Sequence, residues 1–240
     1  MLVEKLPNPR PTTAGSLIMA ALAILLSSAS AQAGFITIDP AGMNAIFSQD
    51  NFDGTPISIR FNPSVQIVAP QLLVINTPAD LAALFSLAPD PAPTVTSFFV
   101  DQINYCGFVE PTINGHYNGC AQFPGNFMLE DSTAAVTDAA GLMGHELGHN
   151  LDLPHSSLGL MWGFLPYVNT ELSPQEVATI LQSPLVQIDS NGQRFITITP
   201  IAIVGAPVAT PEPSTLLLFS AALGALLIVN RKKIRAQPTR

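Results

Sequence analysis

The stretch GHELGHNLDLPHSSLGLMW holds three of the chain's four histidines within eleven positions. Two of them, His145 and His149, are four residues apart, so on a helix they share one face about a turn apart. His155 comes six residues later, too far along to reach that face from the same straight helix. Pro154 cannot continue a helix and also restricts the residue before it. The spacing therefore predicts a helix that ends near Leu151 and a chain that turns back with His155.

This arrangement points to a metal site. Three protein ligands leave one tetrahedral position of a zinc ion open for water, which distinguishes catalytic zinc sites from structural ones. Glu146 lies beside the two helical histidines, within reach of such a water, in the place of a general base. The alternative is that the histidines are ordinary core or solvated residues and that Glu146 is a surface acid. We predict a Zn²⁺ site with His145, His149 and His155 as ligands and Glu146 as the catalytic residue.

The motif resembles that of the metzincin metalloproteases, in which H-E-x-x-H-x-x-G-x-x-H is followed by a methionine turn beneath the zinc. Here it runs from His145 to His155, and Met161 stands at the methionine position. Met161 as an ordinary core residue is the alternative. Residues 119–131 also resemble the family's edge strand, which pairs with extended substrate.

The resemblance covers roughly residues 57–183. It implies an α+β, metzincin-like zincin domain with a mixed twisted sheet, an active-site helix, a C-terminal helix and a cleft between two lobes. It also implies the activity of a zinc-dependent endopeptidase.

Two positions depart from the family pattern. Asp152 stands where the family has glycine, at the left-handed turn that ends the helix. Aspartate tolerates a positive φ at a modest cost, so we expect the turn to be kept; alternatively, Asp152 orients a histidine by accepting a hydrogen bond. Gly163 stands where some metzincins have a transition-state tyrosine. Tyr167 is close in sequence, but no pattern places it.

The N-terminal residues are typical of a secretory signal peptide. Basic Lys5 and Arg10 precede an apolar run over residues 17–26, and Ala31-Gln32-Ala33 forms an A-x-A cleavage pattern. We predict a signal peptide over residues 1–33. A membrane anchor is the alternative, although the run is short for a bilayer span.

The C-terminal residues 211–240 hold three parts in order: Pro-Glu-Pro at 211–213, an apolar run at 215–230 and a basic tail. An apolar helix followed by positive charges is a stop-transfer arrangement. The tail resembles the PEP-CTERM sorting signal of bacterial surface proteins, which an exosortase recognises and removes. The resemblance implies transient inner-membrane insertion of 215–230, then release to the cell surface or extracellular matrix.

The intervening domain, residues 34–210, is strongly acidic. It has two basic side chains against fifteen acidic ones, a formal net charge of −13. Such a surface repels nucleic acid and anionic lipid, so a nucleic-acid function is excluded.

The only two cysteines, Cys106 and Cys120, lie in this domain. Because an exported chain meets an oxidising compartment, we predict a structural disulfide between them. Metal ligation by the pair is the weaker alternative, since its spacing is unlike that of paired zinc cysteines.

Local patterns predict helices and strands in alternating runs. Apolar spacing, N-caps and alternation predict helices over 41–48, 77–86, 134–151 and 173–181, and strands over 56–61, 71–75, 94–103 and 125–131. Ser132 or Thr133 is the expected cap of the third helix. Asn191-Gly192 between alternating segments predicts a hairpin within 185–200.

We expect an exported bacterial zinc endopeptidase acting on a protein or peptide substrate. The alternative is a non-catalytic matrix or adhesive protein that keeps the zinc fold for structure. The fourth histidine, His116, is expected in a loop, with substrate contact or a second metal as the alternative.

Overall fold

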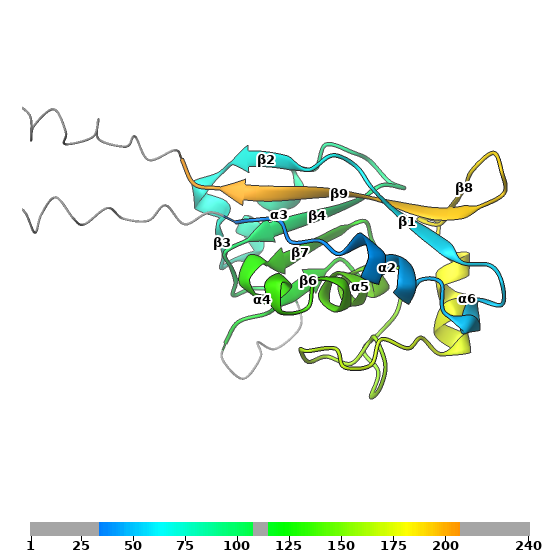
Figure 1. The fold of residues 1–240 in the computed structure, drawn as a ribbon. Helices are drawn as coiled ribbons and strands as arrows, with labels where there is room; N and C mark the ends of the chain where they lie inside the picture. The colour runs from blue at the N-terminus through cyan, green and yellow to red at the C-terminus, as the bar shows by residue number, and fades with distance from the viewer. Residues whose placement is uncertain (1–33, 108–114, 207–240) are drawn as a thin grey trace, which may run out of the picture.

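The computed structural model describes residues 34–107 and 115–206 as an α+β structure with a mixed β-sheet (Figure 1), which confirms the predicted class. The predicted signal peptide (1–33) and sorting signal (211–240), with its apolar run at 215–230, lie outside the described residues. Within the described ranges, no helix has the length and apolar character needed to cross a membrane.

The sheet is parallel through its centre and antiparallel at one edge. Its strands follow the order β1-β9-β4-β7-β6, and β2 and β8 also pair with β9. The pairs of β9 with β1, β2 and β4, and of β4 with β7, are parallel; β6 and β8 join antiparallel. The strands span Ile57–Phe61 (β1), Val65–Val68 (β2), Val95–Val100 (β4), Gly119–Ala121 (β6), Phe127–Asp131 (β7), Gln187–Ile188 (β8) and Arg194–Val204 (β9). A separate two-stranded parallel ladder joins β3 (Val74–Ile75) to β5 (Gln102–Ile103).

Helices cover both faces of the sheet. They span Pro40–Ile46 (α2), Pro78–Phe85 (α3), Ser132–Thr137 (α4), Ala139–Asn150 (α5) and Pro174–Gln182 (α6), with 3₁₀ turns at Asp50–Phe52 (η1) and Pro70–Leu72 (η2). Helices α2, α4 and α5 lie along one face (Figure 1), where Phe99 and Met128 of the sheet pack with Leu147 of α5. On the opposite face, Phe98 packs with Leu84 of α3. Because strand side chains alternate between faces, every residue of β4 is buried.

Two helices begin as their sequences predict. Thr77 and Asp80 form a reciprocal capping box at α3, and Ser173 and Glu176 form another at α6, each with proline in the first turn. These contacts satisfy backbone N–H groups that have no partner inside the helix.

The predicted helix over 134–151 is wrong in its continuity. It is two helices, α4 and α5, that meet at Asp138. The Asp138 side chain accepts a hydrogen bond from Gly141 N–H, and this local bond competes with continuation of the preceding helix. The cap of α4 is also neither Ser132 nor Thr133. It is Asp131, whose Oδ1 accepts from two N–H groups of the first turn.

Two predicted strands are shorter than expected. Residues 71–75 form the end of η2 and the two-residue β3, because Pro70 opens a 3₁₀ turn there. The strand over 94–103 is divided into β4 and β5 at Asp101. The N–H groups of Asp101 and Gln102 both donate to Leu73 O, so this part of the chain bonds to the small ladder.

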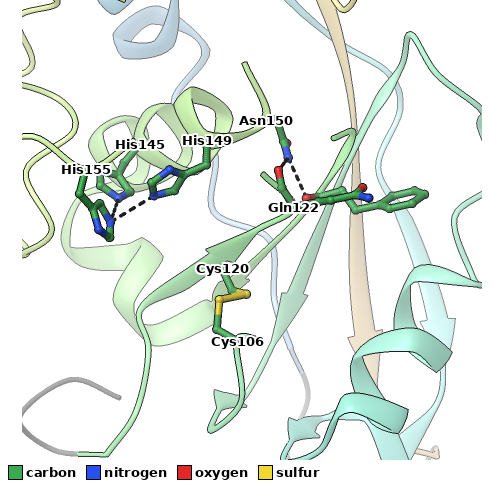
Figure 2. Close-up of a disulfide and its surroundings, with 8 residues drawn as sticks. Cys106, Cys120, Gln122, His145, His149, Asn150 and His155 are labelled. Carbon is green, nitrogen blue, oxygen red and sulfur yellow. Dashed lines mark hydrogen bonds between the residues drawn. A yellow bond between two sulfur atoms is a disulfide. The ribbon is translucent and has the colours of Figure 1, made fainter. Parts of the chain in front are cut away.

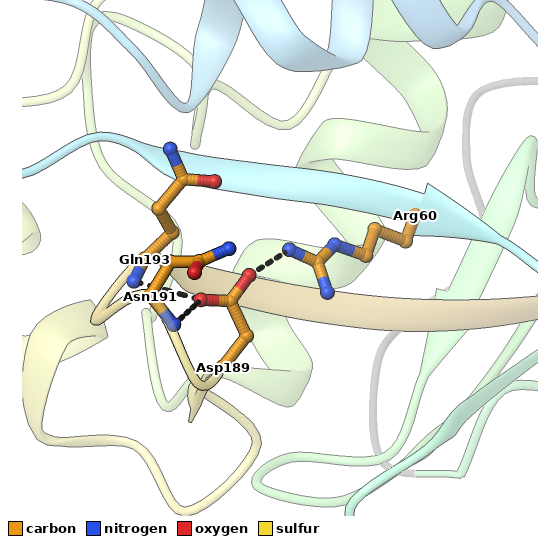
Figure 3. Close-up of polar contacts among 4 residues, drawn as sticks. All are labelled: Arg60, Asp189, Asn191 and Gln193. Carbon is orange, nitrogen blue, oxygen red and sulfur yellow. Dashed lines mark hydrogen bonds and ion pairs between the residues drawn. The ribbon is translucent and has the colours of Figure 1, made fainter.

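The predicted hairpin at Asn191-Gly192 is present between β8 and β9. Asp189 organises its turn: Oδ1 accepts from the N–H groups of Asn191 and Gln193, and Oδ2 pairs with Arg60 at 2.6 Å (Figure 3). Beyond the hairpin, β9 continues as the long strand to which β1, β2 and β4 all pair, which the local hairpin pattern did not predict.

The predicted disulfide between Cys106 and Cys120 is present, with an S–S distance of 2.00 Å. It joins the chain after β5 to the middle of the edge strand β6 (Figure 2). The bridge therefore anchors the strand that forms one wall of the cleft described below.

Candidate metal centre and cleft

The structure brings together the three predicted histidine ligands. His145 and His149 project from α5, and the Nε2 atoms of both approach His155 Nε2, at 3.2 Å and 3.1 Å (Figure 2). One ligand atom from each of the three lies within 4.8 Å of the others. The group could hold a metal ion.

Backbone carbonyls fix the proton positions on the two helical histidines. Nδ1 of His145 lies 2.8 Å from Leu160 O, and Nδ1 of His149 lies 2.8 Å from Leu153 O. Because a carbonyl only accepts, each Nδ1 carries the hydrogen and each Nε2 presents a lone pair to the cluster. Lone pairs that face one another at this distance repel, and a cation between them removes the repulsion. The donor set therefore fits a metal ion.

All three imidazoles are electrically neutral at pH 7, the state in which they bind metals. Burial lowers the pKa of His145 to about 3 and that of His149 to about 4, and it also lowers the pKa of His155. No proton then competes with a metal ion for the Nε2 atoms near neutral pH.

The turn that brings back His155 is a Schellman motif with Asp152 in the left-handed position. Asp152 has a φ of 72°, its N–H donates to His149 O (3.0 Å), and Leu153 N–H donates to Gly148 O (2.9 Å). The prediction that Asp152 keeps the turn is confirmed. Within residues 34–107 and 115–206 its carboxylate accepts no hydrogen bond from a histidine, because Leu153 O and Leu160 O serve as the acceptors.

Glycine at position 152 is therefore expected to be tolerated. Asp152→Gly should raise the free energy of unfolding by about 1 kcal/mol, since glycine has no penalty at positive φ. Asp152→Val should lower it and weaken metal binding, because Leu153 O, the acceptor for His149, would shift. Chemical unfolding and metal titration of both variants measure these effects; a loss of metal affinity in Asp152→Gly would give the carboxylate a role that its contacts do not indicate.

Met161 lies in a turn beneath the site helix. It is fully buried, and a Cβ added to Gly148 would lie 2.4 Å from its Sδ, so α5 and the methionine pack in direct contact. Met161 O accepts from Ser156 N–H at 2.9 Å, which ties the turn to the residue after His155. The same turn supplies Leu160 O to His145. Met161 thus connects the site helix to the turn that carries Leu160 and lies next to His155 in the hydrogen-bond pattern.

Glu146 faces a cleft of about 1010 Å³ together with the three histidines. Its side chain packs against Gly119 of β6, where an added Cβ would lie 2.3 Å from Glu146 Oε1. Burial raises the pKa of Glu146 well above its ordinary value, and repulsion from Glu130 adds to the rise. A carboxyl with a raised pKa is suited to accept a proton near neutral pH.

A second buried carboxyl, Glu130, lies behind Glu146 on β7. Oε1 of Glu130 accepts a hydrogen bond from Ser97 Oγ at 2.8 Å, and Oε2 has no partner among the described residues. Burial raises the pKa of Glu130 to about 8, and the Ser97 contact only partly offsets this rise. Glu130 therefore holds a proton in the folded protein at neutral pH.

Glu130 should make stability depend on pH. Its folded pKa of about 8 exceeds the ordinary value of 4.5, so its contribution to stability is complete below about pH 4.5 and is lost as pH rises to about 8. Glu130→Gln should remove this loss and be more stable than wild type at pH 8.5, with little difference at pH 4.5. Thermal unfolding with chelator present tests this; parallel pH profiles for the two proteins would contradict it.

Tyr167 joins the site, which no sequence pattern placed. Its ring stacks on the His145 imidazole, with centroids 4.9 Å apart and planes at 25°. The ring also lines the cleft. Burial raises the pKa of the phenol, and the nearby Glu146 raises it further. The hydroxyl therefore keeps its proton and remains a hydrogen-bond donor.

The last strand of the sheet, β6, forms one wall of the cleft. Asn118 O and Gln122 N–H bond to β7. Because bonding alternates along an antiparallel pair, the backbone N–H and C=O groups of Gly119 and Ala121 point to the other, unpaired edge. Among the described residues these groups have no hydrogen-bond partner, so the wall beside Glu146 presents backbone N–H and C=O groups along its edge.

Exposed aromatic side chains flank the histidines. Phe123 meets His149 edge to face with ring centroids 5.9 Å apart, and the Trp162 and Phe164 ring centroids lie 5.4 Å apart. Gly163, between Trp162 and Phe164, lies against the His155 ring: a Cβ added to this glycine would be 3.8 Å from the nearest ring atoms. Among the described residues that line the cleft, Glu146 is the only acidic side chain and none is a lysine or an arginine.

Asn150, which follows His149 in the chain, has a structural role that the sequence pattern does not predict. Its Nδ2 donates to Gln122 O (2.8 Å) and Phe127 O (2.9 Å), which fastens α5 to the connection between β6 and β7 (Figure 2).

His116 is not part of the three-histidine group. It hydrogen-bonds with Gln102 and Asn104 at an exposed position.

Comparison of the chain with protein-family models, with curated proteins and with solved structures gives no match.

Proposed function

We propose that the protein is a zinc-dependent endopeptidase with a metzincin-like site. The observation that carries this proposal is the convergence of three histidine Nε2 atoms beside the carboxyl of Glu146 in an open cleft. Among the described residues the ligand group consists of three neutral histidines alone, a set typical of catalytic zinc. The left-handed turn at Asp152 and the packing of Met161 against α5 support the same assignment.

His145, His149 and His155 would hold the ion. Zinc bound there would polarise the carbonyl of a peptide bond and make a water molecule more acidic. The carbonyls of Leu153 and Leu160 keep two of the ligands in the correct tautomer throughout.

Glu146 and Tyr167 supply the remaining chemistry. Glu146 accepts the proton of the water that attacks the carbonyl carbon, then passes this proton to the amine nitrogen as the C–N bond breaks. Tyr167 donates a hydrogen bond from its phenolic O–H to the carbonyl oxygen, on which negative charge develops. Its raised pKa keeps this donor protonated.

An extended peptide is the substrate that suits the cleft. The outward-pointing backbone groups of Gly119 and Ala121 would pair with the substrate's backbone, as when a strand adds to a sheet edge. This pairing places a peptide bond next to Glu146, which packs against Gly119. The aromatic residues Phe123, Trp162 and Phe164 favour uncharged, apolar side chains near the bond that is cut.

We further propose that the enzyme works outside the bacterial inner membrane. The predicted signal peptide and the PEP-CTERM-like tail, with an exosortase as processing partner, account for export and sorting to the cell surface or matrix. The disulfide supports this location, since disulfides persist in oxidising compartments.

A non-catalytic matrix or adhesive protein is the rival function. A structural zinc site needs neither an open cleft nor a carboxyl beside it. Here Glu146, although buried, faces the cleft next to the histidines, and burial is costly for a carboxylate without a chemical role.

Digestion of a mixed peptide library tests the proposal. The zinc-loaded domain should cut internal peptide bonds, with uncharged apolar residues enriched around the cut, and a chelator should abolish cleavage. Mass spectrometry of the products measures both effects. Zinc-loaded protein that leaves every peptide intact would favour the matrix or adhesive protein.

A further inference from the structure

Asp138, at the junction of α4 and α5, uses both oxygens of its carboxylate. Oδ1 accepts a hydrogen bond from Gly141 N–H at 2.9 Å and thereby caps the metal-site helix. Oδ2 accepts from Tyr167 N–H at 3.0 Å, across 29 residues of sequence. One planar group thus joins the first turn of α5 to the segment that carries the tyrosine.

The backbone around Tyr167 depends on this contact. Residues 163–169 form neither helix nor strand, and within the described ranges the bond to Asp138 is the only hydrogen bond that joins them to another element. The next residues are held separately, because the Gln49 side chain bonds to Thr170 O (2.7 Å) and Leu172 N–H (3.0 Å). Loss of the Asp138 contact would therefore let the Tyr167 backbone shift on the core against which its side chain packs, while residues 170–172 stay in place.

The position of this backbone decides where the phenol lies. The Tyr167 ring has two rotatable side-chain bonds and stacks on His145, one of the predicted metal ligands. A shift of the backbone N–H would move the ring along the imidazole and carry the hydroxyl with it. Displacements of about 1 Å at a reacting centre can lower a rate by about 10²-fold.

We propose that Asp138 is a positioning residue for Tyr167: its carboxylate holds the start of α5 and the tyrosine backbone as one unit, so that the phenol stays over His145. Asp138 itself does not line the cleft that the described residues form. The kinetic consequence rests on the proposed peptidase function, whereas the placement of the ring does not.

Asp138→Ser separates the two contacts. Serine is about as good an N-cap as aspartate, but its single hydroxyl cannot cap α5 and also reach Tyr167 N–H. Zinc content and melting temperature should stay near wild type. The kcat for peptide cleavage should fall at least about tenfold with little change in KM. Asp39→Ser is the matched control, because Asp39 caps α2 through Gly42 N–H in the same way.

A double-mutant cycle tests whether Asp138 acts through the tyrosine. Tyr167→Phe removes the hydroxyl and should lower kcat by about 10²–10³-fold, the usual effect of losing an oxyanion donor. Added to Tyr167→Phe, Asp138→Ser should cause no further fall in kcat, because the group it positions is gone. Independent, multiplying effects of the two changes would overturn the proposal.

A second readout does not need activity. In protein with ¹³C-labelled histidine, the ring-current shift of the His145 carbon-bound protons reports the stacked Tyr167 ring. Asp138→Ser should change this shift, and Asp39→Ser should not. An unchanged His145 signal in Asp138→Ser would overturn the proposal even if the wild type cleaves peptides. A changed signal in a protein without activity would support the positioning and reject only the peptidase function.

Discussion

Glu146→Gln should lower the rate of peptide cleavage by at least about 10²–10⁴-fold, the usual contribution of a general base. Glutamine keeps the size of the side chain and its packing against Gly119, but it cannot accept the proton of the attacking water. The three histidines are untouched, so zinc content should stay at the wild-type level. Steady-state cleavage of a peptide found in the library digest, with elemental analysis of the same samples, measures both.

Glu171→Gln is the matched control. Glu171 is exposed, and it contributes a backbone carbonyl rather than its carboxyl to the hydrogen bond with Leu160 N–H. Its activity should equal that of the wild type. A Glu146→Gln enzyme that cleaves at the wild-type rate with zinc bound would defeat the general-base mechanism.

His155→Ala should remove most of the zinc affinity. The variant leaves two ligands on α5, and loss of a direct ligand exceeds the 10–100-fold typical when only a partner of a ligand is lost. Cleavage should disappear with the metal. Competition against a chromophoric chelator gives the affinity, and His116→Ala, which alters the histidine outside the cluster, should bind zinc as the wild type does.

A full zinc complement in His155→Ala at chelator concentrations that the wild type withstands would remove His155 from the ligand set. Loss of His145 or His149 should also lower the zinc affinity. Backbone carbonyls hold both rings in the tautomer that presents Nε2 to the ion.

Local signals predicted the fold where a residue's own neighbours decide its conformation. The helices that begin after Thr77 and Ser173 and the turn at Asn191-Gly192 all form as expected. Pairing across long sequence distances was not predictable in this way. The parallel partners of β9 come from residues more than ninety positions earlier, and alternation within a strand does not say which strand lies beside it.

The site was likewise predictable where neighbouring residues decide the conformation and not where distant segments meet. The i, i+4 spacing and Pro154 predicted that three histidines would meet, and the tolerance of aspartate for positive φ predicted the turn at Asp152. Tyr167 reaches His145 through an irregular segment, so no periodicity could place it. The two oxygens of Asp138 explain this placement and also the break between α4 and α5, where apolar spacing predicted one helix.

The most direct measurement of the central claim is a titration of zinc into metal-free protein, with bound zinc and peptide cleavage followed in the same samples. Cleavage should rise in proportion to bound zinc and stop rising at one ion per chain, held by His145, His149 and His155. Protein that binds this one zinc ion and cleaves no peptide at any point of the titration would contradict it.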